Sequence, residues 1–272
     1  MKRIFTVKTI VSFVFLTFLA SAVYVALKMT SAPSELMAGQ AIAVRSDYTL
    51  MLLQCILGTA AMLLPGILQR KLKITIPSGM LVAFAIFLYC AIYLGEVHYF
   101  YYRIEHWDTL LHTFSGFALG ALGLSIIGLL NKSERVSVSL SPAFVAIFAF
   151  CFAVAIGTVW EIYEFSVDSI SGLNMQKYAL ENGELLIGQA ALADTMKDLI
   201  VDAVGALVIS VVGYVSMKRK EGWLDNMQIN AARPVPGPVP APAAAPVPIP
   251  VYAVIRQPSL APQAPEDGEI VA

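Results

Sequence analysis

The chain has 272 residues, of which 58% are hydrophobic and only 14% are charged. This composition and the strongly positive mean hydropathy predict a membrane protein with several spans and exclude an ordinary soluble domain. The net charge is −1, and the sequence contains no basic patch or recognition motif, so we do not expect nucleic-acid binding.

Six stretches of the chain are mostly apolar over about 18 residues or more, the length needed to cross the hydrocarbon core of a bilayer. They are residues 9–27, 48–68, 79–97, 108–130, 139–160 and 198–216. The first contains Ala20-Ser21-Ala22, a sequence typical of signal-peptidase sites, but its apolar run continues to Leu27. We therefore expect this stretch to remain as a signal anchor, with cleavage as the alternative.

The distribution of lysine and arginine predicts the orientation of the spans. Eleven of these residues lie at the N-terminus or after the second, fourth and sixth stretches, against five in the other connecting segments. By the positive-inside rule both termini are then cytoplasmic.

The composition changes sharply near the C-terminus. Eleven of the fifteen prolines lie beyond Ala231, which predicts an extended, disordered tail that acts as a spacer or as a docking site for a proline-recognising partner. We therefore divide the chain into an N-terminal span and outer loop (1–47), a transmembrane core (48–217) and a cytoplasmic basic segment with the tail (218–272).

Small side chains also stand out within the predicted spans. Gly116 and Gly120 form a Gly-x-x-x-Gly pattern, which predicts a close helix–helix contact inside the chain rather than a dimer interface. Cys55, Cys90 and Cys151 all fall in apolar runs, and none belongs to a metal-binding Cys-x-x-Cys, so we expect buried free thiols.

The most informative residues are ionisable groups inside or beside the spans. Three aspartates recur every fourth residue at the start of the sixth span, and positions four apart lie on one face of a helix. Asp108 and His112 lie four apart at the start of the fourth span, three acids spaced by three and four end the fifth, and a single acid, Glu96, ends the third. The predicted topology brings all of them to the outer end: Glu96, Asp108, His112, Glu161, Glu164, Asp168, Asp194, Asp198 and Asp202. Because a charge in a bilayer costs about 2.5–3.5 kcal/mol or more, we expect these residues to form one shared site rather than to have unrelated roles.

Several carboxylates so close together must be partly protonated or neutralised by a cation. Oxygen ligands with one histidine suit Mg²⁺, Mn²⁺ or Ca²⁺, and Zn²⁺ through the imidazole. The expected ligands or general acid–base groups are Asp108, His112, Glu161, Glu164, Asp198 and Asp202. Glu96, Asp168 and Asp194 would surround them, and the nearby cations Arg103 and Lys197 would form ion pairs or bind an anionic substrate. The alternative is that Asp108, Asp194 and Asp198 cap helix N-termini, which does not explain Asp202, two turns into its span.

Several of these residues lie in motifs that resemble the YjdF-like bacterial inner-membrane proteins over roughly residues 50–217. The motifs are Gly95-Glu96, Tyr101-Tyr102-Arg103, Trp107-Asp108-Thr109-Leu110-Leu111-His112 with Ser115-Gly116, Trp160-Glu161-Ile162-Tyr163-Glu164-Phe165, Asn174-Met175-Gln176 and Asp194-Thr195-Met196-Lys197-Asp198-Leu199. The resemblance implies a polytopic protein of the bacterial inner membrane with no established activity. A more distant similarity to VanZ-like proteins points to the cell envelope.

The sequence thus predicts an all-α transmembrane bundle of about six spans. The leading functional hypothesis is an outward-facing site that binds a divalent metal ion and acts as a hydrolase or transferase on an envelope or lipid-linked substrate. The alternatives are a proton- or ion-coupled transporter and a non-catalytic membrane assembly factor. Oligomeric state is left open.

Overall fold

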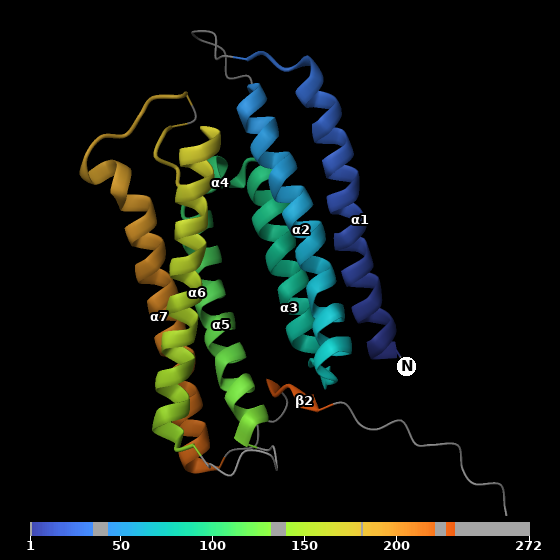
Figure 1. Cartoon of the computed structure of the whole chain (residues 1–272), viewed down its shortest axis with the longest axis vertical. Helices are drawn as coiled ribbons and strands as arrows, with labels where there is room; N and C mark the ends of the chain where they lie inside the picture. The colour runs from blue at the N-terminus through green and yellow to red at the C-terminus, as the bar shows by residue number, and fades with distance from the viewer. Residues whose placement is uncertain (1, 35–42, 132–139, 181, 221–226, 232–272) are drawn as a thin grey trace, which may run out of the picture. The chain divides into compact units, whose positions relative to one another are not determined.

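The computed structural model describes residues 2–34, 43–131, 140–180, 182–220 and 227–231. Most of these residues are helical (Figure 1). The elements in chain order are α1 (Lys2–Ser31), α2 (Arg45–Leu72), β1 (Ile74–Thr75), α3 (Ser78–Leu88), the π-helix η1 (Tyr89–Val97), α4 (Phe100–Arg103), α5 (Trp107–Asn131), α6 (Pro142–Ser171), α7 (Gln189–Arg219) and β2 (Asn230–Ala231).

Six helical stretches in the described part of the chain are long and apolar enough to cross a membrane, which confirms the predicted all-α fold with six spans. Their ends differ from the predicted ones where polar residues continue the helix. Helix α6 runs to Ser171 and α7 begins at Gln189, whereas the apolar pattern stops at residue 160 and resumes at 198. Hydropathy locates the part of a helix that matches the bilayer, and the extra turns carry the acidic residues beyond it. The predicted disorder of the proline-rich tail concerns residues outside those described.

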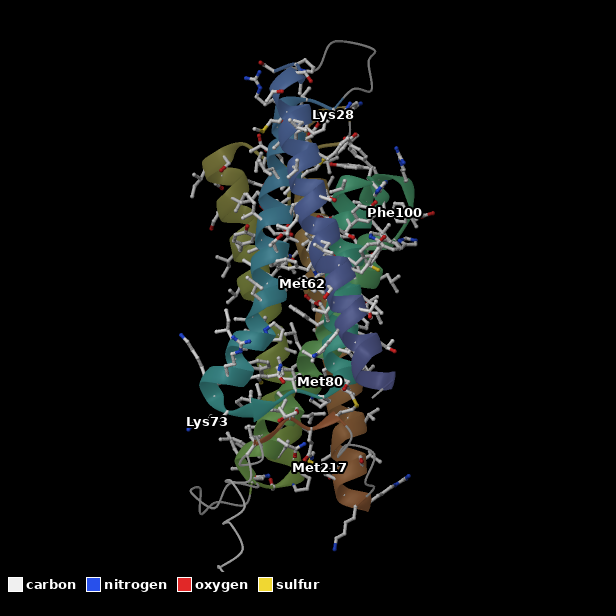
Figure 2. The ribbon with its side chains drawn as sticks, turned by 90° about the vertical axis from the view of Figure 1, so that its right-hand side faces the viewer. Lys28, Met62, Lys73, Met80, Phe100 and Met217 are labelled. Atoms are coloured by element: carbon white, nitrogen blue, oxygen red, sulfur yellow. The ribbon has the colours of Figure 1, made fainter. Side chains whose placement is uncertain are left out.

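The spans pack as two groups of three (Figure 1), and Figure 2 views them from the α1 side. Helices α1, α2 and α3 with η1 share one apolar core, in which Phe18 and Cys55 are fully buried. Helices α5, α6 and α7 share a second core, which includes Ala149 and Ile209. Each group therefore buries its own apolar surface.

We call the end at which α2, α5 and α7 begin the acidic end. There the two groups meet in a third cluster, where Leu50 of α2 packs with Leu173 and Met175, which follow α6. The indole Nε1 of Trp107 also donates a hydrogen bond to the Cys90 carbonyl oxygen across the groups, at 3.3 Å.

At the opposite end the chain returns after α7 and joins both groups. Strand β2 pairs antiparallel with β1, with Ile74 opposite Ala231. The Ile229 backbone N–H donates to Ser125 Oγ of α5 at 2.6 Å, and the Met227 carbonyl oxygen accepts from the same hydroxyl at 3.2 Å. The segment 227–231 thus lies between α5 and the turn after α2.

The closest helix contact joins α5 and α7, and glycines make it. A Cβ added at Gly116 would collide with the Asp202 backbone, and one at Gly205 would collide with the Thr113 carbonyl oxygen. At Gly120 it would lie 3.5 Å from the Ala206 Cα. The predicted Gly-x-x-x-Gly contact within the chain is confirmed, and it brings the start of α7 against the start of α5.

The segment η1 departs from the predicted α-helix. Residues 89–97 form i→i+5 hydrogen bonds, so this turn of the third span is wider than an α-helical turn. Gly95 lies on it where a Cβ would strike the Tyr101 ring, and Glu96 follows. π-helical turns occur often at functional sites, and this one carries a candidate acid.

The three cysteines are free thiols, as expected, but they differ in burial. Cys55 is buried and Cys90 is partly buried. Cys151 is exposed, so the prediction of burial is wrong there. On a transmembrane helix an apolar run continues on the face toward lipid, which hydropathy does not distinguish from the packed face.

Candidate metal site

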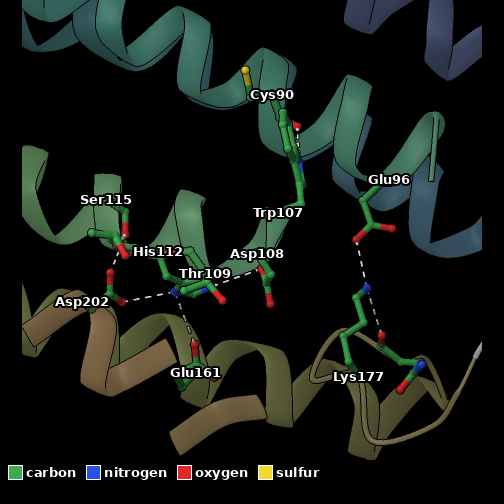
Figure 3. A network of polar contacts seen from close by, with 12 residues as sticks. Cys90, Glu96, Trp107, Asp108, Thr109, His112, Ser115, Glu161, Lys177 and Asp202 are labelled. Atoms are coloured by element: carbon green, nitrogen blue, oxygen red, sulfur yellow. Dashed lines mark hydrogen bonds and ion pairs between the residues drawn. The ribbon is translucent and has the colours of Figure 1, made fainter. Parts of the chain in front are cut away.

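A histidine of α5 and an aspartate of α7 form the centre of the acidic end (Figure 3). His112 Nδ1 lies 3.3 Å from Asp202 Oδ2, and its Nε2 lies 3.7 Å from Asp108 Oδ1, one turn earlier on the same helix. Ser115 Oγ lies 2.6 Å from Asp202 Oδ1, within hydrogen-bond distance. One carboxylate oxygen of Asp202 therefore contacts the His112 imidazole, and the other contacts the Ser115 hydroxyl.

The absence of a side chain at one position of α6 leaves room for the Asp202 carboxylate beside His112. The Asp202 side chain occupies the space where Gly157 of α6 lacks one, because a Cβ there would lie 2.8 Å from Asp202 Oδ2. Asp202 is 2% exposed. A larger residue at position 157 would displace the carboxylate from His112.

Glu161 of α6 is a buried acid without a hydrogen-bond partner. The residue is 4% exposed, and neither carboxylate oxygen has such a partner among the described residues. Its Oε1 lies 4.0 Å from His112 Nδ1, and the Thr195 hydroxyl is near without meeting hydrogen-bond geometry. Leaving a buried acceptor unsatisfied costs about 1–3 kcal/mol, and more for a charged group. Such an acid needs a proton, a cation or a bound ligand.

Three other side-chain atoms are spaced as metal ligands. Asp108, His112 and Asp198 each offer one donor atom, and these atoms all lie within 4.8 Å of one another. Ligands about 2.0–2.6 Å from a divalent ion lie roughly 3–5 Å apart, depending on the angle at the metal. The three atoms could hold one ion between α5 and α7 after small movements.

The remaining predicted acids have different surroundings. Glu164 is nearly buried beside the same cavity, and Asp194 is half-buried one turn before Asp198. Asp168 has a structural role instead, because its two oxygens accept hydrogen bonds from the backbone N–H groups of Met175 and Gln176, at 2.8 and 2.9 Å. It fixes the loop that follows α6.

Lys177, which is on that loop, is the cation that the sequence reasoning missed. Its Nζ lies 3.4 Å from Glu96 Oε1 and over the rings of Tyr101 and Tyr102, at 4.9 and 5.4 Å from their centroids. Burial lowers the pKa of Lys177, but the negative charge of Glu96 and its neighbours outweighs it, and the pKa is raised. The signal was present: Lys177 directly follows the Asn174-Met175-Gln176 motif.

The two cations named from the sequence lie elsewhere. The Arg103 guanidinium is over the Tyr99 ring, 5.6 Å from its centroid, and Lys197 is exposed. Tyr101 is closer to the acids: burial first, then the negative charges of Asp108 and Glu96, raise the pKa of its phenol. Its hydroxyl stays protonated and available as a donor.

A cavity of about 300 Å³ opens beside these groups. Polar residues line it toward the acidic end, and apolar residues of α2, α3, α5 and α6 line the rest. The polar lining residues on the helices and the loop are Gln54, Glu96, Tyr101, Asp108, His112, Ser115, Glu164, Lys177 and Asp202.

Residues 10–219, which cover all or nearly all of each span, match the family described as Predicted membrane protein (DUF2238). The chain belongs to this family. It is therefore an integral membrane protein of a family without an assigned function, and the DUF2238 region contains every residue of the candidate site.

A curated relative is similarly uninformative about activity. The chain is 31% identical over 121 residues to an uncharacterized protein of Thermotoga maritima, which covers 44% of this chain and 54% of that protein. The chain thus spans about half the length of this relative. No solved structure matches the chain.

Proposed function

We propose that the acidic end binds one divalent cation and uses it in hydrolysis or group transfer on a lipid-linked or envelope substrate. The observation that carries the proposal is the clustering of Asp108, His112 and Asp198, whose donor atoms lie within 4.8 Å. The buried carboxylate of Glu161 supports it: no hydrogen-bond partner for it is found among the described residues, His112 Nδ1 approaches only to 4.0 Å, and an acid so placed needs a positive charge or a proton nearby.

In this proposal each group around the ion has a role that its position supports. Asp202 holds His112 through Nδ1, which directs Nε2 toward Asp108 and leaves it free to bind a metal. Metal-binding histidines usually donate their second ring N–H to a carboxylate, a backbone carbonyl or water, which fixes the tautomer and the ring orientation. Ser115 in turn fixes Asp202. Glu161 and Glu164 would complete the ligand set or move protons.

Mg²⁺, Mn²⁺ and Ca²⁺ suit a site with mostly oxygen ligands, and Zn²⁺ suits it through His112. A bound ion would polarise a substrate oxygen or activate water. The buried acids and the imidazole beside it are placed to accept and donate the proton that hydrolysis requires.

A coupled transporter would need polar groups that continue toward the opposite end. The deep part of the cavity is lined by Phe87, Leu119 and Ile156, which are apolar. Farther along, Ser125 already bonds the backbone of the returning segment. This arrangement favours chemistry at one end over a path through the protein. A non-catalytic assembly factor would not require the metal.

The cellular setting of the proposal follows from sequence. The positive-inside rule puts the acidic end outside and both termini in the cytoplasm. The motif resemblance to YjdF-like proteins, which is consistent with DUF2238, supports a location in the bacterial inner membrane.

The test is Mn²⁺ binding to detergent-purified protein, measured by calorimetry and by electron paramagnetic resonance. We expect one equivalent to bind, and Asp198→Asn or His112→Gln to weaken binding by about tenfold or more. Glu105→Gln is the matched control, because Glu105 is an 87% exposed acid at the same end. Absence of binding, or equal binding by Asp198→Asn and Glu105→Gln, would refute the proposal.

A further inference from the structure

The cavity beside the candidate metal site changes from polar to apolar with depth. Glu96, Asp108 and Lys177 line it at the acidic end, and Phe87 and Leu119 line it deepest in the bundle. Between them, the wall of α2 is formed by Gln54, Leu57, Gly58 and Ala61, and only Gln54, the one of the four nearest the acidic end, carries a polar side chain.

This gradient runs parallel to the spans. Asp108 and Leu119 both lie on α5, eleven residues apart, which corresponds to about 16 Å at 1.5 Å per helical residue. The hydrocarbon core of a bilayer is about 30 Å thick. The cavity therefore reaches from the level of the polar groups to about the middle of the membrane, with the same polarity profile as one leaflet.

Its size suits a chain rather than a bulky ligand. Its volume of about 300 Å³ is at the lower limit of the range of about 300–1,000 Å³ that is usual for ligand pockets.

The polar end is equipped for an anionic headgroup. Lys177 has three N–H donors, and two acceptors for them are present in the described residues, Glu96 Oε1 and the Asn174 carbonyl oxygen. Lys177 lines the cavity together with the Tyr101 ring. A divalent ion at Asp108 and His112 would add positive charge on the other side of the head.

We propose that this cavity binds a single-chain amphiphile with a phosphate headgroup. The chain extends along the apolar walls toward Leu119, and the phosphate lies between Lys177 and the cation site. The headgroup half of this assignment rests on the proposed function, whereas the chain half rests on the cavity alone. A phosphate without a chain shares the head chemistry but leaves the apolar walls empty.

The test uses purified protein in nanodiscs loaded with Mn²⁺, titrated calorimetrically with empty nanodiscs subtracted. Three probes separate the contributions: dodecyl phosphate, inorganic phosphate and dodecanol. We expect dodecyl phosphate to bind at least about tenfold more tightly than either of the others. Equal binding of both phosphates would show a free-phosphate site and overturn the proposal, and equal binding of dodecyl phosphate and dodecanol would overturn the headgroup assignment.

Two neighbouring alanines of α2 provide a matched pair of variants. Ala61 lines the cavity, whereas Ala60 is exposed on the outside of the same helix turn. Ala61→Leu should weaken dodecyl phosphate binding about tenfold, because added methyl groups take the space of the chain. Ala60→Leu should leave dodecyl phosphate binding unchanged. Melting temperatures in nanodiscs verify that both variants are folded. Equal binding by the two variants would refute the chain site.

Lys177→Gln tests the headgroup. It should weaken dodecyl phosphate and inorganic phosphate alike, by about tenfold, since each loses the same charged hydrogen bond. Unchanged binding would refute the role of Lys177. If Mn²⁺ does not bind but dodecyl phosphate still binds and depends on Ala61, the metal proposal fails and the amphiphile site stands.

Discussion

Replacing Gly116 by alanine tests the α5–α7 contact that brings Asp202 to His112. A Cβ at position 116 would lie 2.7 Å from the Asp202 carbonyl carbon and closer still to its oxygen, whereas ordinary contact begins near 3.4 Å. The two helices must therefore separate by at least 0.7 Å. A gap of that size forfeits about a quarter to a half of the dispersion attraction across the interface.

The expected destabilisation is about 2–3 kcal/mol, the usual cost of an overpacked contact. At about 2–4 °C per kcal/mol for a protein of this size, the melting temperature should fall by about 5–10 °C. The assay is thermal unfolding in detergent, followed by tryptophan fluorescence. Mn²⁺ affinity should fall as well, because the same movement lengthens the His112–Asp202 contact.

Gly66→Ala is the matched control. Gly66 also lies within a span, on α2, but a Cβ there meets nothing within 4 Å. Alanine is favoured over glycine in a helix by about 1 kcal/mol, so this variant should be as stable as the wild type or more so. If the two alanine variants melt together, the α5–α7 packing described above is wrong.

Three further substitutions test contacts at the two ends of the bundle. Asp168→Asn removes one of two acceptors for backbone N–H groups and should destabilise the protein by about 2 kcal/mol, with faster amide exchange in the loop after α6. Ser125→Ala leaves a buried N–H of segment 227–231 without an acceptor, at about 1–3 kcal/mol, and exchange should rise in that segment. Lys177→Gln should lower the melting temperature at pH 7–9, because Glu96 loses its ion-pair partner. The pKa of Lys177 is raised above its ordinary value of 10.5, so its stabilising effect is complete below that pH and is lost as the pH rises through the folded value.

Two of these three substitutions have a matched control, and the third is judged by its pH dependence. Ser12→Ala removes an exposed hydroxyl from α1 and should leave exchange at the opposite end unchanged. For Asp168, the exposed Glu105→Gln separates loss of charge from loss of the backbone contacts. A melting difference between wild type and Lys177→Gln that disappears below pH 9 would contradict the lysine assignment.

The apolar pattern indicated the level at which His112 and Asp202 lie within their spans, as well as the number of spans. The fourth and sixth stretches begin at residues 108 and 198, so His112 and Asp202 each lie four residues inside. In the structure these two side chains form a hydrogen bond. The bilayer fixes the level of a residue, and helical spacing fixes its face, which is why two distant parts of the chain could be matched from sequence.

Contacts made by loops were not predictable in this way. Lys177 reaches Glu96 only because Asp168 binds the loop backbone, and no periodicity encodes that turn. The return of Met227 and Ile229 to Ser125 is similar, since it depends on the path of the chain after α7. The exposure of Cys151 depends on which face of α6 packs against the other helices, and an evenly apolar run does not indicate that face.

The π-helical turn η1 places Glu96 in the cavity although the third span contains one residue more there than a regular α-helix would hold. A wider turn accommodates a residue that a regular α-helix does not. Removing one residue between Tyr89 and Gly95 would allow the segment to close into an α-helix, and the side chains that follow would keep nearly their present directions. The same deletion in a regular α-helix would instead rotate every following side chain by about 100° around the axis. Among related chains, a single deletion in this turn should therefore leave Glu96 opposite Lys177, whereas a single deletion between Asp108 and His112 in the α-helical α5 should disrupt the site.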